Sequence, residues 1–526
     1  MSKLQSLVLL ISSMTHSEKK AFSLLANRKG SKKDYLELYD TIVGNKTKDA
    51  TIIRVEFLKK RPGSSMETTV RYLFDLIMKL LLDQREMQDS NFLLFNKILK
   101  ARILFEKSLF DESFELLRYV ILRAEKYENY NALHLASRLE LEYLLALNFP
   151  NIDEKTLLKK QFKLNEILKY LRKVNEQSSL YEILKHRDIY KGHARSKKQK
   201  DDLNDLVYSE ISIIASLNLE NFEISKLHQL FQSNYLISVG DYMSALNSYY
   251  ELNKLFEANT HLWNDPPIYY LHTLAGLLES LRGIRNYTGM DYFIGRLKQL
   301  ETKSASFNIN RTCITYLYEL FPLLDRGDFV ASKTLMCQYQ NNLYEKLNSL
   351  NITHQAELCL YTSLIYFGNS DYKKAHKFLN QIILRGKNFY SFPLYRTIRL
   401  VNLMILYKLD DLELIRYEIR SIKRDLTGSE KAYKIERFML KFFNKQLPLI
   451  AKKRFQYWNK IEDDLSEIQA DVFERQILRI FDFTAWVESM VLKIPLQEIL
   501  EARIVKKDDV NGTLNVRHGK TRSTTG

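Results

Sequence analysis

A short cluster that recurs in the second half of the chain constrains its fold more than any other sequence feature. Each copy has an acidic residue or Asn, then a bulky apolar or aromatic residue, and then a stretch that favours a helix. The copies are Asp241-Tyr242, Asn286-Tyr287, Asp328-Phe329, Asp371-Tyr372 and Asp411-Leu412. Their second residues are 45, 42, 43 and 40 positions apart. Self-similarity at such a period is typical of a solenoid that stacks pairs of helices.

Each copy also carries the side-chain spacing of one helix face. The residues three positions after the bulky residue are Ala245, Met290, Ser332, Ala375 and Ile415. Those seven positions after it are Tyr249, Ile294, Met336, Leu379 and Ile419. These offsets fall on one face of a helix, where a small residue lets two helices approach and a large one fills the groove between them. Gly240 and Gly327 suit the turn before the helix, and the acidic residue can cap its first turn.

The best copies resemble the turn and second helix of the tetratricopeptide repeat. Tyr242 and Tyr372 correspond to the mid-repeat aromatic residue of that family, and Ala245 and Ala375 to its small residue. The resemblance implies a right-handed superhelix of antiparallel helix pairs. It covers residues 222–427.

A weaker form of the pattern extends the resemblance to residues 91–190. There Leu109-Phe110 is followed by Ser113 and Leu117 at the same offsets. The chain departs from the family in three ways. Its spacing exceeds the family's repeat of about 34 residues, the Trp-Leu-Gly signature of the first helix is missing, and the closing Pro is mostly absent.

The composition agrees with an all-α fold. Only 16 Gly and 8 Pro occur among 526 residues, so residues that break helices are scarce. A hydrophobic content of 45% with 27% charged residues is that of a folded protein. The three cysteines, Cys313, Cys337 and Cys359, are too widely spaced for a zinc site or a disulfide framework. They are expected to be small core residues in a reducing compartment.

The repeats divide the chain into five expected parts. Residues 1–90 form an N-terminal helical cap, 91–220 a region of long helices with weak repeats, 221–427 the repeats, 428–505 a C-terminal helical cap, and 506–526 a disordered tail. Expected helices in the first part lie near 2–13, 16–27, 32–43, 50–60 and 64–87, and a capping box of Thr15 and Glu18 begins the second.

The segment 50–82 could also contain a helix-turn-helix. Two expected helices are joined by Arg61-Pro62-Gly63-Ser64, and the second would present Thr68, Thr69 and Arg71. Any helical hairpin with a Gly turn gives the same pattern.

No catalytic constellation is found in the sequence. No pair of His residues has the spacing of a zinc-binding helix with a nearby Glu, and no phosphate-binding glycine loop or nucleophile elbow occurs. His186 and His193 are seven residues apart, without an evident third ligand. The chain is therefore expected to be no enzyme and to need no cofactor or metal.

Charge gives the remaining functional clue. The chain has 79 Lys and Arg against 63 Asp and Glu, a net charge of +16. The densest basic stretch consists of Lys185, Arg187, Lys191, Arg195, Lys197, Lys198 and Lys200. Such a stretch can contact an anionic partner, although a solvated loop and helix end would have the same composition.

Two functions follow as hypotheses. The first is a cytoplasmic scaffold or adaptor without a membrane span, which binds another protein or a peptide on the concave face of the repeats. The alternative is a transcriptional regulator that binds nucleic acid through its N-terminal helices and uses the repeats as a sensor. The sequence does not identify the partner.

Overall fold

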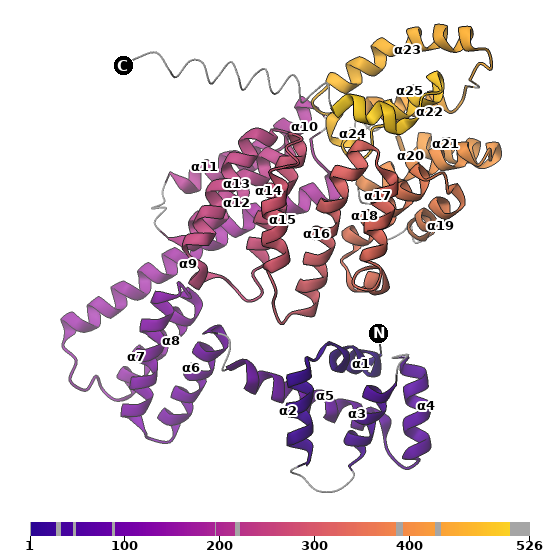
Figure 1. The fold of residues 1–526 in the computed structure, drawn as a ribbon. Helices are drawn as coiled ribbons and strands as arrows, with labels where there is room; N and C mark the ends of the chain where they lie inside the picture. The colour runs from indigo at the N-terminus through magenta and orange to yellow at the C-terminus, as the bar shows by residue number, and fades with distance from the viewer. Residues whose placement is uncertain are drawn as a thin grey trace. The chain divides into compact units, whose positions relative to one another are not determined.

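The fold is helical throughout the part of the chain that the computed structural model describes. This part comprises residues 2–27, 33–45, 49–86, 90–194, 196–215, 221–384, 393–426, 433–445 and 447–504. Within these ranges the regular elements are all helices, which confirms the all-α prediction (Figure 1). The chain divides into two compact units, Met1–Arg172 and Lys173–Gly526. The tail predicted at 506–526 lies outside the described residues.

The first unit begins with five helices that match the expected ones to within about two residues. They are α1 (Lys3–Ser13), α2 (His16–Asn27), α3 (Asp34–Gly44), α4 (Ala50–Lys60) and α5 (Met66–Glu86). The predicted capping box is present, because Thr15 N donates to Glu18 Oε2 at 2.7 Å and Glu18 N donates to Thr15 Oγ1 at 3.2 Å. Leu7, Leu38 and Phe57 are fully buried in a hydrophobic core that these helices share.

Longer helices make up the rest of the first unit. They are α6 (Ser90–Glu106), α7 (Phe110–Lys126), α8 (Tyr130–Ala146) and the first part of α9 (Glu154–Lys191), within which the division between the units falls. Helix α7 packs against both α6 and α8. At the first contact the buried Ser113 donates its hydroxyl to the carbonyl of Ala101 at 2.7 Å, so these two helices approach closely.

The second unit continues with a series of helices in which each one from α12 to α21 packs against the next along the chain (Figure 1). They are α10 (Lys197–Asp201), α11 (Asn204–Ile214), α12 (Phe222–Ser238), α13 (Tyr242–Ala258), α14 (Ile268–Gly283), α15 (Met290–Gln299), α16 (Ala305–Arg326), α17 (Phe329–Gln338), α18 (Ile352–Gly368), α19 (Tyr372–Ile383), α20 (Pro393–Lys408), α21 (Leu412–Leu426), α22 (Lys434–Phe442), α23 (Ala451–Ala470), α24 (Arg475–Leu478) and α25 (Phe483–Leu492). Two short 3₁₀ helices, Thr260–Leu262 and Tyr344–Ser349, lie in connections. A last helix covers 496–504.

The recurring acidic residue belongs to one repeated turn. The residue before it has a positive φ in each copy, namely Gly240, Arg285, Gly327, Ser370 and Asp410. The next N–H then bonds back to the carbonyl five residues earlier, as Asp241 N does to Leu236 O at 2.9 Å. This geometry ends one helix in a Schellman motif. The acidic side chain then begins the following helix, because Asp241 accepts from Ser244 N at 3.1 Å.

The two expected helix-face positions are buried in every copy. The residues three and seven positions after the bulky residue are at most 7% exposed. Glycines provide further close approaches. A Cβ on Gly283 would lie 2.3 Å from Tyr242 Cγ, and one on Gly368 would lie 2.0 Å from Phe329 Cγ. An aromatic residue at a repeat turn therefore occupies the space left by a glycine about 40 residues later.

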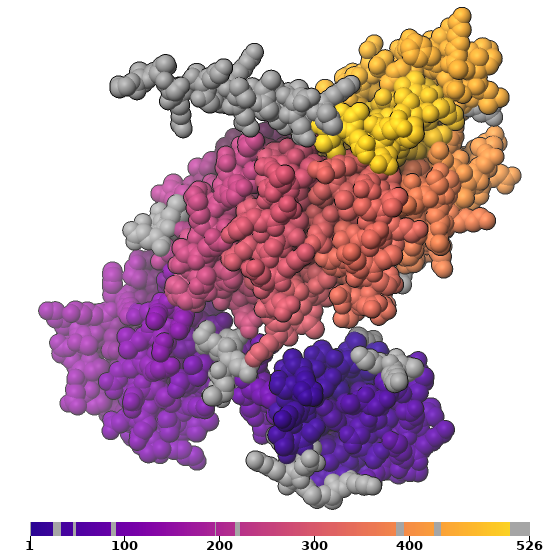
Figure 2. All heavy atoms as spheres, viewed as in Figure 1, coloured from indigo at the N-terminus to yellow at the C-terminus, as the bar shows by residue number. Residues whose placement is uncertain are grey.

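The C-terminal helices pack against several of the repeat turns. The guanidinium of Arg282 donates to the carbonyl of Arg479 at 2.6 Å, and that of Arg285 donates to the carbonyl of Arg503 at 3.4 Å. Trp486 is 1% exposed and lies against Tyr407 on α20. In Figure 2 the yellow C-terminal residues lie directly against orange and red ones.

One expectation about the cysteines is wrong. Cys313 and Cys359 are buried, but Cys337 on α17 is exposed. Its helix has ten residues and buries only Phe329, Ser332 and Met336, and the position after Met336 faces solvent. A short helix with a narrow buried face leaves such neighbours outside the core.

Candidate functional site

Charged and aromatic side chains of the second unit form one cluster, which is joined by ion pairs, hydrogen bonds and mutual effects on pKa. They come from the C-terminal part of α9, from α14, α16 and α18, and from the segment after α24. At its centre Glu279 of α14 forms an ion pair with Arg479 at 2.5 Å and accepts a hydrogen bond from the hydroxyl of Tyr318 at 3.1 Å. The two charged side chains are 22% and 16% exposed, so water still reaches them. We call this cluster the ionisable groove.

A second ion pair supports one side of the groove. Arg282 donates to both carboxylate oxygens of Asp325, at 3.1 and 2.9 Å, and its guanidinium lies 3.6 Å from the centre of the Phe321 ring. The hydroxyl of Tyr287 also donates to Asp325 at 3.0 Å. The Arg282 side chain is only 4% exposed. A bidentate pair with this much support holds the adjacent groove residues in fixed positions.

The two carboxyl groups in the groove differ in their ionisation. Burial would raise the pKa of Glu279, but the guanidiniums of Arg479 and Arg282 outweigh it and lower this pKa. Burial raises the pKa of Glu357 on α18 to about 7, and the negative charge of Glu279 adds to this effect. Glu357 therefore changes its charge near neutral pH, beside a carboxylate that stays ionised.

The basic side chains of the groove are also perturbed. The ring of His272 on α14 is exposed, yet desolvation by surrounding protein, with the charge of Lys185 nearby, lowers its pKa to about 4. Desolvation also lowers the pKa of Lys185 on α9. Nδ1 of His272 lies 3.4 Å from the hydroxyl of Tyr181, within hydrogen-bonding distance. A side chain that is open to water but surrounded by protein is typical of a recess rather than of a convex surface.

A pocket opens at the α9 end of the groove. It has a volume of about 470 Å³. Its lining residues are Tyr181, Glu182, Lys185, His186, Ile189, Tyr190, Asn264, Pro266, Ile268, Tyr269 and His272. We call it the seam pocket, because α9 forms one wall and α14 with the segment before it forms the other.

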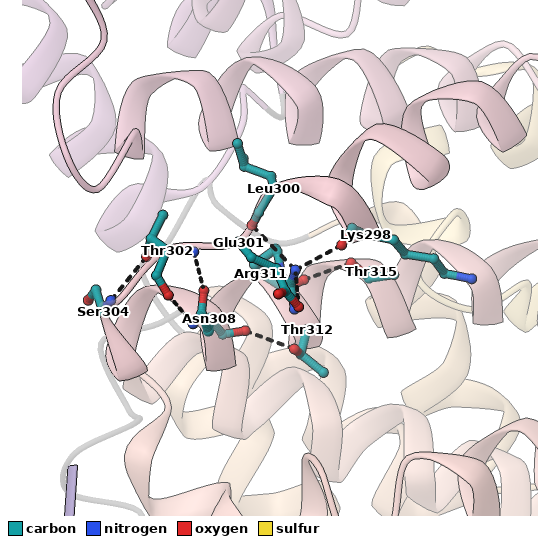
Figure 3. A network of polar contacts seen from close by, with 9 residues as sticks. All are labelled: Lys298, Leu300, Glu301, Thr302, Ser304, Asn308, Arg311, Thr312 and Thr315. Atoms are coloured by element: carbon teal, nitrogen blue, oxygen red, sulfur yellow. Dashed lines mark hydrogen bonds and ion pairs between the residues drawn. The ribbon is translucent and has the colours of Figure 1, made fainter. Parts of the chain in front are cut away.

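A separate polar network fixes the connection between α15 and α16 (Figure 3). Arg311 donates to the carbonyls of Lys298 and Leu300, at 3.0 and 3.3 Å. Asn308 donates to the carbonyl of Thr302 at 2.6 Å and accepts from its N–H at 3.1 Å. These bonds satisfy backbone groups of the loop, so we interpret the network as structural.

The predicted basic stretch is not one continuous cationic surface. Lys185 lines the seam pocket, whereas Arg187 forms a bidentate pair with Asp205, at 2.8 and 2.6 Å. Four other members of the stretch are exposed, namely Lys191, Lys197, Lys198 and Lys200. Arg195 lies outside the described residues. His186 and His193 do not share a helix, because α9 ends at Lys191.

The possible helix-turn-helix has a mixed surface charge. At its turn Lys60 pairs with Glu37 at 3.0 Å, and Arg61 pairs with Asp34 at 3.6 Å. Thr68 and Arg71 are exposed as expected, but Thr69 is only 9% exposed and donates its hydroxyl to the carbonyl of Ser65. The exposed residues of α5 include both signs, namely Glu67, Arg71, Asp75 and Lys79.

The sequence analysis missed the residues at the centre of the groove. A local signal was present for two of them, since Glu279 and Glu357 are single charges within apolar helical stretches, Leu277–Leu281 and Ala356–Leu360. No such signal marks Arg479, which reaches the groove from 200 positions away along the chain.

Comparison with known proteins gives no further guidance. No family model matches the chain, and no curated protein or solved structure is significantly similar to it. Among the described residues no group of three or more His, Cys, Asp or Glu could hold a metal ion. No described helix is long and apolar enough to cross a membrane.

Proposed function

We propose that the second unit is a scaffold of stacked helix hairpins, similar to a tetratricopeptide array, which binds a protein segment or peptide in the ionisable groove. The repeated Schellman turns, the capped second helices and the glycine–aromatic contacts support the hairpin array. Helices α14, α16 and α18 are then the first helices of successive hairpins and line the concave face. The function is recognition rather than catalysis.

The observation that carries this proposal is the cluster of partly exposed charged side chains around Glu279 and Arg479. Each of these side chains already has a protein partner, so its position is fixed before a ligand arrives. Binding to fixed groups costs less conformational entropy than binding to mobile ones. A peptide can therefore gain directional polar contacts along the groove. The free thiols of the chain suit a reducing compartment such as the cytoplasm.

Nucleic-acid binding is the second candidate. The exposed lysines Lys191, Lys197, Lys198 and Lys200 favour it, as does the net charge of +16. The pairing of Arg187 with Asp205 and the acidic residues on α5 weaken the case. Lys197, Lys198 and Lys200 are followed directly by Asp201 and Asp202, which reduce the local positive charge.

Copurification of the full chain from native lysate separates the two candidates. We expect a discrete protein partner that survives nuclease and high salt, is lost with His272→Glu, and is retained when Lys197, Lys198 and Lys200 are all changed to Glu. His272 is exposed, so its substitution should leave the fold intact, which circular dichroism can verify. Nucleic acid that elutes with the chain at low salt, and is lost with the triple lysine variant, would instead support the second candidate.

A further inference from the structure

The seam pocket has aromatic and apolar walls that its own helices leave uncovered. Ile189, Tyr190 and Ile268 are 42%, 45% and 49% exposed at its edge. His186 lies against the Tyr190 ring with their centroids 4.6 Å apart. A single exposed apolar side chain is ordinary, whereas several that gather around one recess are typical of a binding site.

A positive charge whose one close contact among the described residues is an aromatic ring lies in the same pocket, since the ammonium of Lys185 is 5.9 Å from the centre of the Tyr181 ring. No ion pair joins the ammonium of Lys185 to a carboxylate of the described residues, although Asp188 and Glu279 attract it from a distance. Both of these carboxylates have closer partners, since Asp188 accepts from Ser238 Oγ at 2.6 Å and Glu279 pairs with Arg479. Glu182, the one carboxylate in the lining, is exposed. A partly desolvated ammonium is stabilised by an incoming anion.

The size and opening of the pocket indicate what kind of ligand it accepts. Its volume of about 470 Å³ is within the usual range for ligand sites. The pocket is open to solvent on one side rather than enclosed. An open pocket buries one large side chain of a longer ligand better than a whole small molecule. Lys185 in its lining is close enough to Glu279 of the groove for their charges to interact.

We propose that the seam pocket is the anchor subsite of the groove and binds a peptide segment in which an aromatic residue stands beside Asp or Glu. The aromatic ring packs among Tyr181, Tyr190 and Tyr269, and the carboxylate accepts a hydrogen bond from Lys185. Aromatic anchors in desolvated pockets dominate many interfaces. A charge-assisted bond to a partly buried lysine adds selectivity for the acidic neighbour. This inference rests on the function proposed above and specifies its ligand.

Random decapeptide arrays probed with the full chain test the proposal. We expect bound peptides to be enriched in an aromatic residue adjacent to Asp or Glu. Lys185→Met keeps the apolar stem and removes the charge. It should remove the acidic preference, weakening binding of the best acidic peptide about tenfold, and leave the aromatic preference intact. Lys191→Met, on the same helix and exposed, is the matched control and should change neither preference.

Three results would contradict the proposal. Two of them leave the proposed function of the groove standing, and the third contradicts that function as well. If peptides bind without an aromatic and acidic preference, or if Lys185→Met behaves like Lys191→Met, the pocket is not the anchor subsite and the groove function stands. If no peptide is bound by a chain whose circular dichroism is unchanged, the groove function and the subsite both fail. Ile268→Lys gives a second check, because it should reduce aromatic enrichment from the exposed rim of the pocket.

Discussion

Single residues at the helix contacts determine how closely neighbouring helices pack. Gly276 on α14 shows this most clearly, because a Cβ at this position would lie 2.1 Å from Cζ of Tyr249. Tyr249 is 1% exposed, so it has little room to move. Gly295 on α15 is also inside a helix, but nothing lies within 4 Å of the Cβ it would carry. The two glycines make a matched pair.

Gly276→Ala should destabilise the second unit by about 1–3 kcal/mol, because the added methyl overpacks a closed contact. Gly295→Ala should be neutral or stabilising by up to about 1 kcal/mol, since alanine favours the helix. Thermal and urea unfolding followed by circular dichroism would measure both. Equal effects of the two substitutions would show that the Tyr249 contact does not constrain the helices.

Glu357 should make the stability of the folded chain depend measurably on pH. Its pKa in the folded chain is about 7, above the usual 4.5, because of desolvation and the charge of Glu279. Between these two values the unfolded carboxyl group loses its proton first, so rising pH destabilises the folded state. The lowered pKa values of His272 and His354, both about 4, act in the opposite direction between pH 4 and 6.5.

Glu357→Gln isolates the carboxyl contribution from that of the histidines. The melting temperature of the variant minus that of the wild type should increase as pH rises from 5 to about 7. Above that pH the difference should stay constant. Melting curves at several pH values provide the measurement. A difference that does not vary with pH would mean that Glu357 has an ordinary pKa.

At the scale of helices, local sequence predicted the turns between successive helices, and contacts between distant segments determined where the C-terminal helices pack. Gly240 and Asp241 were identifiable because a Schellman turn and an N-cap each require particular residue types. The helix bounds in 1–90 followed from turn residues and apolar spacing in the same way. The return of the C-terminal helices to the repeat turns has no local signal, since Arg479 and Glu279 interact across 200 positions.

Arg479→Met should loosen the C-terminal helices from the repeat turns. It removes the ion pair with Glu279 and the contact of the guanidinium with the Tyr242 ring, 4.7 Å from its centre. Removing one partner of a largely buried pair typically costs about 3–5 kcal/mol. Hydrogen exchange should accelerate in residues 472–492 and 236–245. Arg475→Met is the control, because Arg475 bonds only to nearby carbonyls, those of Gln469 and Ala470, and is exposed. Unchanged exchange in Arg479→Met would contradict this role.

At the scale of the molecule, the sequence predicted the all-α fold better than the candidate site. The repeated spacing can be recognised from the order of residues along the chain. The buried positions three and seven residues after each bulky residue follow from helix geometry. The groove combines α9, α14, α16, α18 and a C-terminal arginine, which no single stretch of sequence brings together. The basic stretch at 185–200 was recognisable from its many Lys and Arg residues. In the structure one member lines the pocket, another forms an ion pair, and others are exposed to solvent.

The most direct test of the central claim is photocrosslinking from inside and outside the groove. The photoreactive residue p-benzoylphenylalanine would replace His272 in one full-length variant and Tyr292, 60% exposed on α15, in another. Both variants would be irradiated in native lysate after nuclease treatment. The account predicts that the His272 position crosslinks to a discrete protein partner and that the Tyr292 position does not. Crosslinking only from Tyr292, or equally from both positions, would contradict the groove as the binding surface.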